Sequence, residues 1–358
     1  MNLLGFIKYR WHIIFSVVLT ITSFVMRLWD LGLRAMHHDE SLHAYYSWIL
    51  YSGNGYQHDP MMHGPFQIQA TAGIFFIFGD SDYTARLLYV LAGTALVFIP
   101  FLLRNRLGIC GYLIVSSMLA FSPTMLYFSR FARNDIIMAV WVFGLVVCMW
   151  GYLDTGKPRY IYAGSVLLAF AFCTKETAYM ATIMLGMFLA LVVVFRNWGE
   201  GFRDFEVYGM STPVAITAFV TEVWRLVVSS TKSVVGSRAA DFFIFLFVIS
   251  LPLGAAFVGV FQDTALLNWT GFVLAAPAGT NAPIGSPVGG GLVIAFLVVL
   301  ILALSSIYIG SKWNPGVFWR CASIFYSIFI LLHTTFLTNF VAGLGSGFWR
   351  SLGYWTVQ

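Results

Sequence analysis

The sequence predicts an all-α integral membrane protein with about nine transmembrane helices and further interfacial helices in its first long loop. Hydrophobic residues make up 59% of the chain, charged residues only 10%, and the mean hydropathy is +0.81. Apolar runs long enough to cross a bilayer recur throughout the chain. The net charge of +5 resides in short loops, and no soluble basic domain is present to bind nucleic acid. We therefore expect membrane lipids, and no nucleic acid, as partners.

The expected membrane spans follow from the apolar runs and from the loop charges between them. They lie at 11–29, 86–103, 108–121, 136–153, 160–173, 177–195, 242–261, 291–309 and 317–339. The first run lacks a signal-peptide cleavage site, so we expect an uncleaved anchor. The apolar segment 66–78 is best placed as a helix in the outer interface, because most basic loop residues then fall on the inner side. This topology predicts a plasma-membrane protein with a cytoplasmic N-terminus.

Three parts are expected along the chain. Residues 1–195 form a membrane core with a long outer first loop at 30–85, and residues 241–358 form C-terminal membrane helices. Between them, 196–240 is an inner connection whose apolar stripe at 216–227 predicts an amphipathic interfacial helix.

The first outer loop concentrates the ionisable residues that the rest of the chain avoids. Five of the seven histidines lie between His37 and His63, together with Asp39, Glu40 and Asp59. A carboxylate such as Asp39 can act as a general base toward an incoming hydroxyl. The alternative is structural, since Asp39 is also placed to cap a short helix that begins at Glu40.

The histidines of this loop allow two further interpretations. A divalent cation is one, because imidazole and carboxylate groups are suitable ligands. The candidate ligands are His37, His38, Asp39 and His63, although their spacing matches no established metal motif. The other interpretation is that His58, Asp59 and His63 form hydrogen bonds with sugar hydroxyls or phosphate.

The connection before the fourth span carries two arginines and an aspartate. Arg130 and Arg133 could hold a phosphate through forked hydrogen bonds. The alternative is contact with lipid headgroups, with Asp135 capping the following helix.

Lys175 and Glu176 interrupt an otherwise apolar hairpin between the fifth and sixth spans. They could neutralise each other in a turn, or Lys175 could bind an anionic phosphate. Ionisable groups near a membrane tend to line functional cavities. Because the expected topology puts 30–85, 122–135 and 174–176 on one outer side, we expect these three connections to share a site.

These strings, in this order, resemble the polyprenyl-phosphate-sugar-dependent glycosyltransferases of the GT-C fold. The similarity is greatest to the protein O-mannosyltransferase and lipid A aminoarabinose transferase superfamily, also called glycosyltransferase family 39-like. It extends over about residues 10–195. The matching strings are Asp39-Glu40, His58-Asp59-Pro60, His63-Gly64-Pro65, Gly79 to Arg86, Ser122-Pro123 and Arg130 to Asp135.

The resemblance implies a GT-C-like helical bundle and the transfer of a sugar from a polyprenyl-phosphate donor, with inversion, to an acceptor on the outer side. The acceptor class (protein, lipid or glycan) stays open. Asp39 would take the acceptor's proton, and Glu40 and Asp135 would orient the acceptor or hold a cation. Residues expected to bind the donor phosphate are Arg86, Arg130, Arg133 and Lys175. Those expected to bind the acceptor or sugar are His58, Asp59, His63 and Glu176.

The chain also departs from these relatives. Aminoarabinose transferases carry a Lys-Pro-Pro string where this chain has His63-Gly64-Pro65, and relatives usually continue beyond the position of Gln358. The C-terminal part is therefore expected to be a shortened version of theirs. A non-catalytic membrane subunit of a larger complex is the main alternative function. A transporter fits less well, because transporters place ionisable groups within their spans and show repeated halves.

Overall fold

The computed structural model describes residues 3–201, 237–262, 264 and 269–357. Within these ranges the chain is a bundle of helices without a β-strand, apart from one isolated bridge between Val273 and Val288. The predicted all-α architecture is confirmed. The interfacial helix expected at 216–227 lies outside the described residues.

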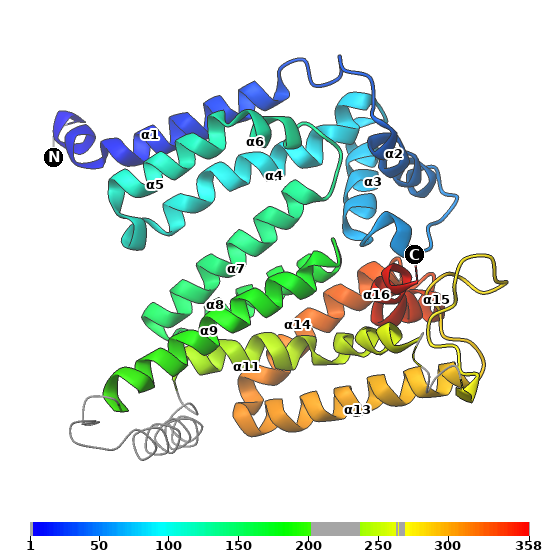
Figure 1. Cartoon of the computed structure of the whole chain (residues 1–358). Coiled ribbons are helices and arrows are strands. Elements are labelled where there is room, and N and C mark those ends of the chain that lie inside the picture. The colour runs from blue at the N-terminus through cyan, green and yellow to red at the C-terminus, as the bar shows by residue number, and fades with distance from the viewer. Residues whose placement is uncertain (1–2, 202–236, 263, 265–268, 358) are drawn as a thin grey trace, which may run out of the picture.

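Three long helices form the first group in the bundle. They are α1 (Leu3–Leu28), α4 (Asp82–Leu102) and α5 (Arg104–Phe121), and they pack side by side (Figure 1). A single turn of helix, α6 (Pro123–Phe128), follows α5 at the end where α4 begins. Tyr89 and Leu96 of α4 share a buried cluster with Ile136 and Ile137 of α7 (Asp135–Thr155), which links this group to the second.

The second group contains the remaining long helices. They are α7 (Asp135–Thr155), α8 (Arg159–Phe172), α9 (Thr177–Gly201), α11 (Arg238–Ser250) with its 3₁₀ continuation η3 (Leu251–Phe261), α13 (Gly290–Trp313) and α14 (Pro315–His333). Their largest core cluster centres on the fully buried rings of Phe242, Phe245 and Phe325. In a membrane such rings stabilise the bundle through close van der Waals packing rather than through removal from water.

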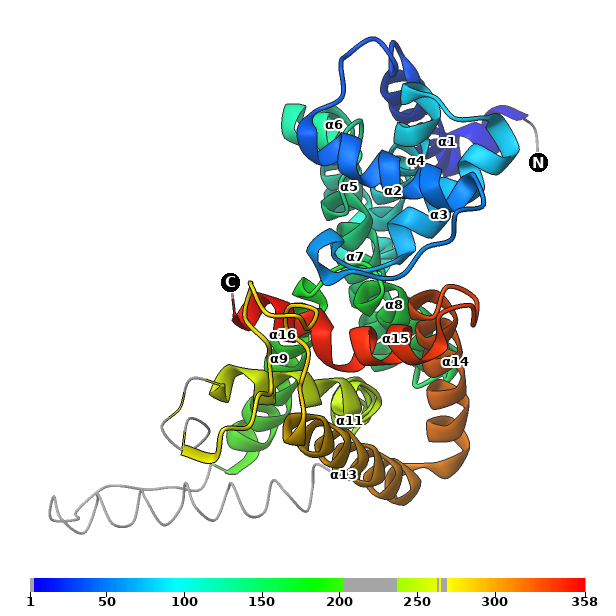
Figure 2. The same ribbon diagram turned by 90° about the vertical axis from the view of Figure 1, so that its right-hand side faces the viewer.

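Short elements cover one end of both groups (Figures 1 and 2). From the first loop come α2 (His38–Tyr51), η1 (Pro60–Met62) and α3 (Phe66–Phe78). From the C-terminus come α15 (Phe340–Gly345), the π-turn η4 (Ser346–Arg350), α16 (Ser351–Gly353) and η5 (Tyr354–Thr356). The connections α1–α4, α6–α7 and α8–α9 all lie at this end, as expected for loops on one side of a membrane.

Six helices among the described residues are long and apolar enough to span a membrane. They match the expected spans at 11–29, 86–103, 136–153, 242–261, 291–309 and 317–339. The other three expected spans are helical but shorter or interrupted. Helix α5 breaks at Gly108, whose φ is +70°, α8 has only 14 residues, and the apolar part of α9 is Thr177–Val193.

Helix α3 occupies the segment expected to lie in the interface. Its 13 residues give a length of about 20 Å, less than the roughly 30 Å of a bilayer's hydrocarbon core. It runs across the end where α4 begins, at a steep angle to that helix (Figure 1). Both observations support the placement of 66–78 outside the set of spans.

Candidate functional site at one end of the bundle

The first loop and the α8–α9 turn are joined by backbone hydrogen bonds. The amide of Gly64 donates to the Thr174 carbonyl at 3.1 Å, and the amide of Phe66 donates to the Cys173 carbonyl at 2.9 Å. A Cβ on Gly64 would lie 2.2 Å from the Cys173 carbonyl oxygen, so only glycine permits this approach. The side chain of Asn134 adds a third connection, since its amide donates to the Thr174 carbonyl at 3.4 Å. The expected convergence of the three connections is therefore present.

The start of α2 separates the neighbouring carboxylates Asp39 and Glu40. The helix begins at His38, and its cap is His37 rather than Asp39 as the sequence suggested. The His37 Nδ1 accepts from the Asp39 amide at 3.3 Å, and Glu40 accepts from the His37 amide at 3.0 Å. This capping box turns Glu40 into the protein and leaves Asp39 on the surface.

Glu40 and Arg86 form a buried ion pair with both side chains fully buried. The Arg86 Nε donates to Glu40 Oε1 at 2.9 Å and its Nη2 to Oε2 at 3.1 Å. Other donations from Arg86 go to backbone carbonyls of Leu31, Arg34 and Ala35. Glu40 was expected to assist catalysis and Arg86 to bind phosphate. In the structure both groups are occupied inside the fold, by each other and by backbone groups.

The surroundings of Glu40 also fix its charge. Burial alone would raise the pKa of this carboxyl group, but hydrogen bonds from Arg86 and from the amides of His37 and Ala132 together hold the pKa below its ordinary value. The Ala132 amide donates to Oε1 at 3.0 Å. An ionised Glu40 therefore ties the first loop to α4 and to the segment before α7.

Four other charged residues form what we call the open ion-pair chain: Asp39, Arg133, Asp135 and Lys175. Arg133 Nη1 lies 3.3 Å from Asp39 Oδ2, and Arg133 Nε lies 3.4 Å from Asp135 Oδ2. Lys175 Nζ lies 2.5 Å from Asp135 Oδ1. The side chains of Asp39, Arg133 and Asp135 are 36%, 39% and 42% exposed, whereas Lys175 is 15% exposed. Each of the three connections thus contributes to one accessible cluster.

Two structural alternatives considered from the sequence do not hold in the structure. Lys175 and Glu176 do not pair with each other, because Lys175 binds Asp135 and Glu176 Oε2 lies 2.8 Å from His63 Nδ1. Asp135 is not the cap of α7 either; the cap position belongs to Asn134, whose side chain forms no capping hydrogen bond.

Arg130 was expected to share a phosphate with Arg133 but points elsewhere. Its Nη2 donates to the Trp29 carbonyl at 2.5 Å, and it lines a pocket together with Arg34. The two arginines, three residues apart just before α7, therefore serve different surfaces.

His43 lies beside the open ion-pair chain and was not singled out from the sequence. It is buried one turn after Asp39 on α2, and its Nδ1 lies 2.8 Å from Gln67 Nε2. Burial lowers its pKa to about 4, and the charges of His63, Asp39, Arg133 and Asp135 also act on it. The spacing of four residues from Asp39 on one helix is the signal that could have identified it.

The residues expected to bind an acceptor lie where the first loop meets the C-terminus. His58 is buried; its ring is hydrogen-bonded to the Ser346 hydroxyl and, at 2.7 Å, to the His63 carbonyl. The ring of His63 stacks on Trp355 with centroids 5.3 Å apart. Asp59 caps η1 and lies 3.7 Å from Arg350. Sequence reasoning assigned no role to these C-terminal partners, because nothing in the local pattern links them to the first loop.

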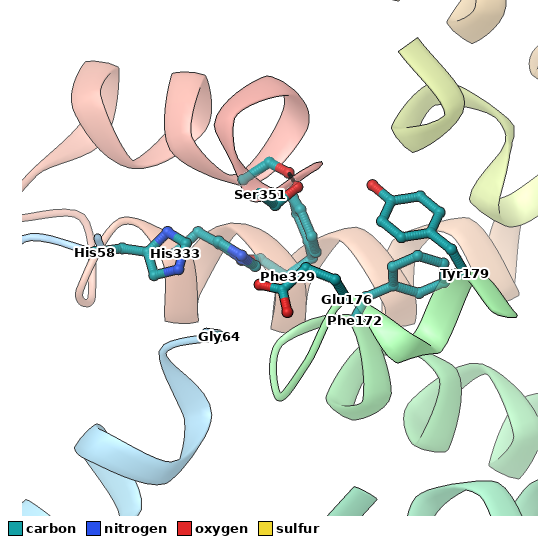
Figure 3. A pocket seen from close by; sticks show the side chains of 9 residues that line it. His58, Gly64, Phe172, Glu176, Tyr179, Phe329, His333 and Ser351 are labelled. Carbon is teal, nitrogen blue, oxygen red and sulfur yellow. Dashed lines mark hydrogen bonds between the residues drawn. The ribbon is translucent and has the colours of Figure 1, made fainter. Parts of the chain in front are cut away.

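A small pocket opens at this contact (Figure 3). Its polar groups come from His58, Glu176, His333 and Ser351, while Phe172, Tyr179 and Phe329 form apolar walls. Burial lowers the pKa of His58 to about 4, so His58 is neutral there at physiological pH.

The ligands proposed for a divalent cation are not gathered into one site. In the part of the chain that the structure describes, no group of three His, Cys, Asp or Glu side chains is close enough to hold a metal ion. His37 caps α2, Asp39 contacts Arg133, and His63 binds Glu176. The metal set His37, His38, Asp39 and His63 therefore does not fit this arrangement.

The chain is also similar in sequence to a known protein family. A family model described as dolichyl-phosphate-mannose-protein mannosyltransferase matches residues 62–224, which include Arg133, Asp135 and Lys175. The match covers less than half of the chain and supports a relation to the GT-C, glycosyltransferase family 39-like superfamily. No curated protein matches the chain, and no solved structure matches it.

Proposed function

We propose that this chain is a membrane glycosyltransferase that moves a sugar from a polyprenyl-phosphate donor to an acceptor, inverting the anomeric carbon. The observation that carries the proposal is the open ion-pair chain, in which three connections bring two carboxylates and two cations to one end of the bundle. The family match supports the same reaction class, because it covers two of those three connections.

Asp39 is the proposed general base. Its carboxylate contacts Arg133 through Oδ2 and stays more than one-third exposed, so it can reach a proton on an incoming hydroxyl. The acceptor oxygen would attack the anomeric carbon while the bond from that carbon to the phosphate oxygen breaks. The bonding electrons would stay on the phosphate, and the acceptor's proton would pass to Asp39.

Arg133 and Lys175 are the proposed phosphate ligands. A departing lipid phosphate is already an anion, so it needs nearby positive charge rather than a strong acid. In the structure both cations contact Asp135. We infer that Asp135 holds them in place and that a bound phosphate competes with it for their hydrogen bonds.

His63 and Glu176 are proposed to face the sugar or the acceptor, since their pair is next to Lys175 and only partly buried. His58 and Asp59 would act by positioning, because His58 holds the His63 carbonyl and Asp59 caps the preceding turn.

We also propose that this end of the bundle faces outward in the plasma membrane, with the N-terminus in the cytoplasm. Reporter fusions after Gly79 and after Arg106 would then report outside and inside, respectively. The opposite pair of results would reverse the orientation of the site.

Turnover by the purified wild-type protein tests the reaction class. We expect it to release free polyprenyl phosphate from polyprenyl-phosphate mannose or a related donor and to give a product of inverted anomeric configuration. If it neither binds nor consumes any of these donors, the chain is better explained as a non-catalytic membrane subunit.

A further inference from the structure

A pocket that carries two arginines lies beside the buried ion pair, on the side of α1 and α6. Its walls are Leu31, Arg34, Pro123, Leu126, Tyr127 and Arg130. Four of these six side chains have no charge and a largely apolar surface, whereas the other two are arginines. A pocket of this composition suits a ligand that carries an anionic group next to apolar chains.

The pocket holds more positive than negative charge. Arg34 donates to Glu40 at 2.8 Å and to the Tyr127 hydroxyl at 3.2 Å, but Glu40 already neutralises Arg86. No described acidic side chain pairs with Arg130.

Arg130 also keeps an unused hydrogen-bond donor. Its Nε is buried and has no hydrogen-bond partner, while its Nη2 is held by the Trp29 carbonyl. A buried donor without a partner is costly, and a guanidinium group fits a phosphate through two parallel hydrogen bonds. An anion in the pocket would give the Nε of Arg130 a hydrogen-bond partner and would balance the charge of its guanidinium group.

The helices that lead to the pocket carry exposed apolar side chains. In α1 and the segment after it they include Val18, Ile21, Val25, Trp29 and Leu33, and in α5 they include Ile114, Met118 and Phe121. Trp29 is 70% exposed, and it lies at the end of α1 where interfacial tryptophans are usual. The anion-binding groups are therefore at the level of lipid headgroups, above a surface that suits acyl chains.

We propose that this pocket binds the phosphate of an anionic membrane phospholipid between Arg34 and Arg130, with the acyl chains against α1 and α5. The ligand is distinct from the sugar donor. The proposed donor phosphate binds Arg133 and Lys175, whereas Arg130 is held by the Trp29 carbonyl and lines this separate pocket. A bound lipid would tie α1 to α6 next to the buried ion pair.

Native mass spectrometry of the full-length, delipidated protein tests this proposal. We expect phosphatidylglycerol to bind at least about tenfold more tightly than zwitterionic phosphatidylcholine, and Arg130→Gln to weaken its binding by at least about tenfold, the loss expected for charge-assisted hydrogen bonds. Arg130→Lys should give an intermediate affinity, because it retains the charge and loses the fork. Thermal unfolding of each variant checks that the fold is intact.

Arg104→Gln is the matched control, because Arg104 is an exposed arginine at the other end of the bundle that contacts the ring of Phe101. Equal loss of phosphatidylglycerol binding in Arg104→Gln and Arg130→Gln, or no loss in either, would overturn the site.

Competition with other phosphates identifies the occupant. Inorganic phosphate should not displace phosphatidylglycerol at concentrations where phosphatidylglycerol saturates the protein. If polyprenyl phosphate binds with the same dependence on Arg130 and phosphatidylglycerol does not bind, the occupant is the carrier lipid and the phospholipid assignment is wrong. No outcome depends on turnover.

Discussion

Asp39 and Glu40 are adjacent in the first turn of α2, yet they lie in opposite environments. Glu40 is fully buried and accepts hydrogen bonds from two arginines and two backbone amides. Asp39 is 36% exposed and contacts a single arginine at 3.3 Å. Glu40 belongs to the buried ion pair, and Asp39 belongs to the open ion-pair chain. A concentration of charge therefore marks a region, and unused hydrogen-bonding capacity marks the residues within it that can act on a ligand.

The largest expected effect comes from breaking the buried ion pair. Glu40→Gln leaves the guanidinium of Arg86 buried without a countercharge, so we expect the free energy of unfolding to fall by about 3–5 kcal/mol. Unfolding in detergent measures this loss. Asp39→Asn should change the same quantity by less than about 1 kcal/mol. Equal losses from the two substitutions would remove the distinction between the two regions.

Acid should weaken the buried part of this end of the bundle. Burial sets the pKa values of His43 and His58 to about 4, below the ordinary 6.5. Between pH 6.5 and 4 the unfolded chain binds protons that the folded chain does not, so stability falls as the pH falls. By pH 4.5 the loss should reach about 2–3 kcal/mol for each histidine.

The pKa of Glu40 is also depressed, so its contribution is present above the ordinary carboxyl pKa and is lost at still lower pH. Unfolding measured from pH 7.5 to 4.5 gives the slope, and His58→Gln should reduce it. A wild-type stability that does not change over this range would show that the two histidines are not held neutral by the fold.

Substitutions in the open ion-pair chain should lower the affinity for the sugar donor rather than the stability of the fold. Lys175→Gln removes one proposed phosphate ligand and should weaken binding of a polyprenyl-phosphate sugar by about 10–100-fold, with little change in stability. Lys157→Gln is the control, since Lys157 is an exposed lysine at the other end of the bundle. Unchanged donor affinity in Lys175→Gln would exclude Lys175 from the phosphate site.

The smallest effect is expected where an ion pair is exposed and far from the site. Arg106 pairs with Asp154, with the two side chains 44% and 41% exposed. Arg106→Gln should cost about 0–1 kcal/mol of stability and leave sugar transfer unchanged. A large fall in transfer would mean that activity responds to surface charge anywhere on the protein.

Part of this arrangement could be predicted from the sequence. The apolar runs, together with the distribution of basic residues between them, predict which connections share a membrane side, and this was enough to bring Asp39, Arg133, Asp135 and Lys175 to one end. The separation of Asp39 from Glu40 was not predictable, because it depends on His37 capping the helix two residues earlier than expected.

Other features depend on contacts that no local pattern encodes. Arg130 and Arg133 have the same chemistry, but Arg130 donates to the Trp29 carbonyl and lines another pocket. The contacts of His58 with Ser346 and of His63 with Trp355 join segments almost 300 residues apart in sequence. Such contacts arise from tertiary packing, so no local sequence pattern predicts them.

The rate of sugar transfer by Asp39→Asn, normalised to the amount of folded protein, tests the central claim most directly. The substitution keeps the shape of the side chain and removes the proton acceptor, so the rate should fall by at least about a hundredfold. Asp154→Asn alters an equally exposed, arginine-paired aspartate at the opposite end of α7 and should retain the wild-type rate. An Asp39→Asn protein as active as wild type would contradict the assignment of Asp39 as the base and, with it, the functional role of the open ion-pair chain.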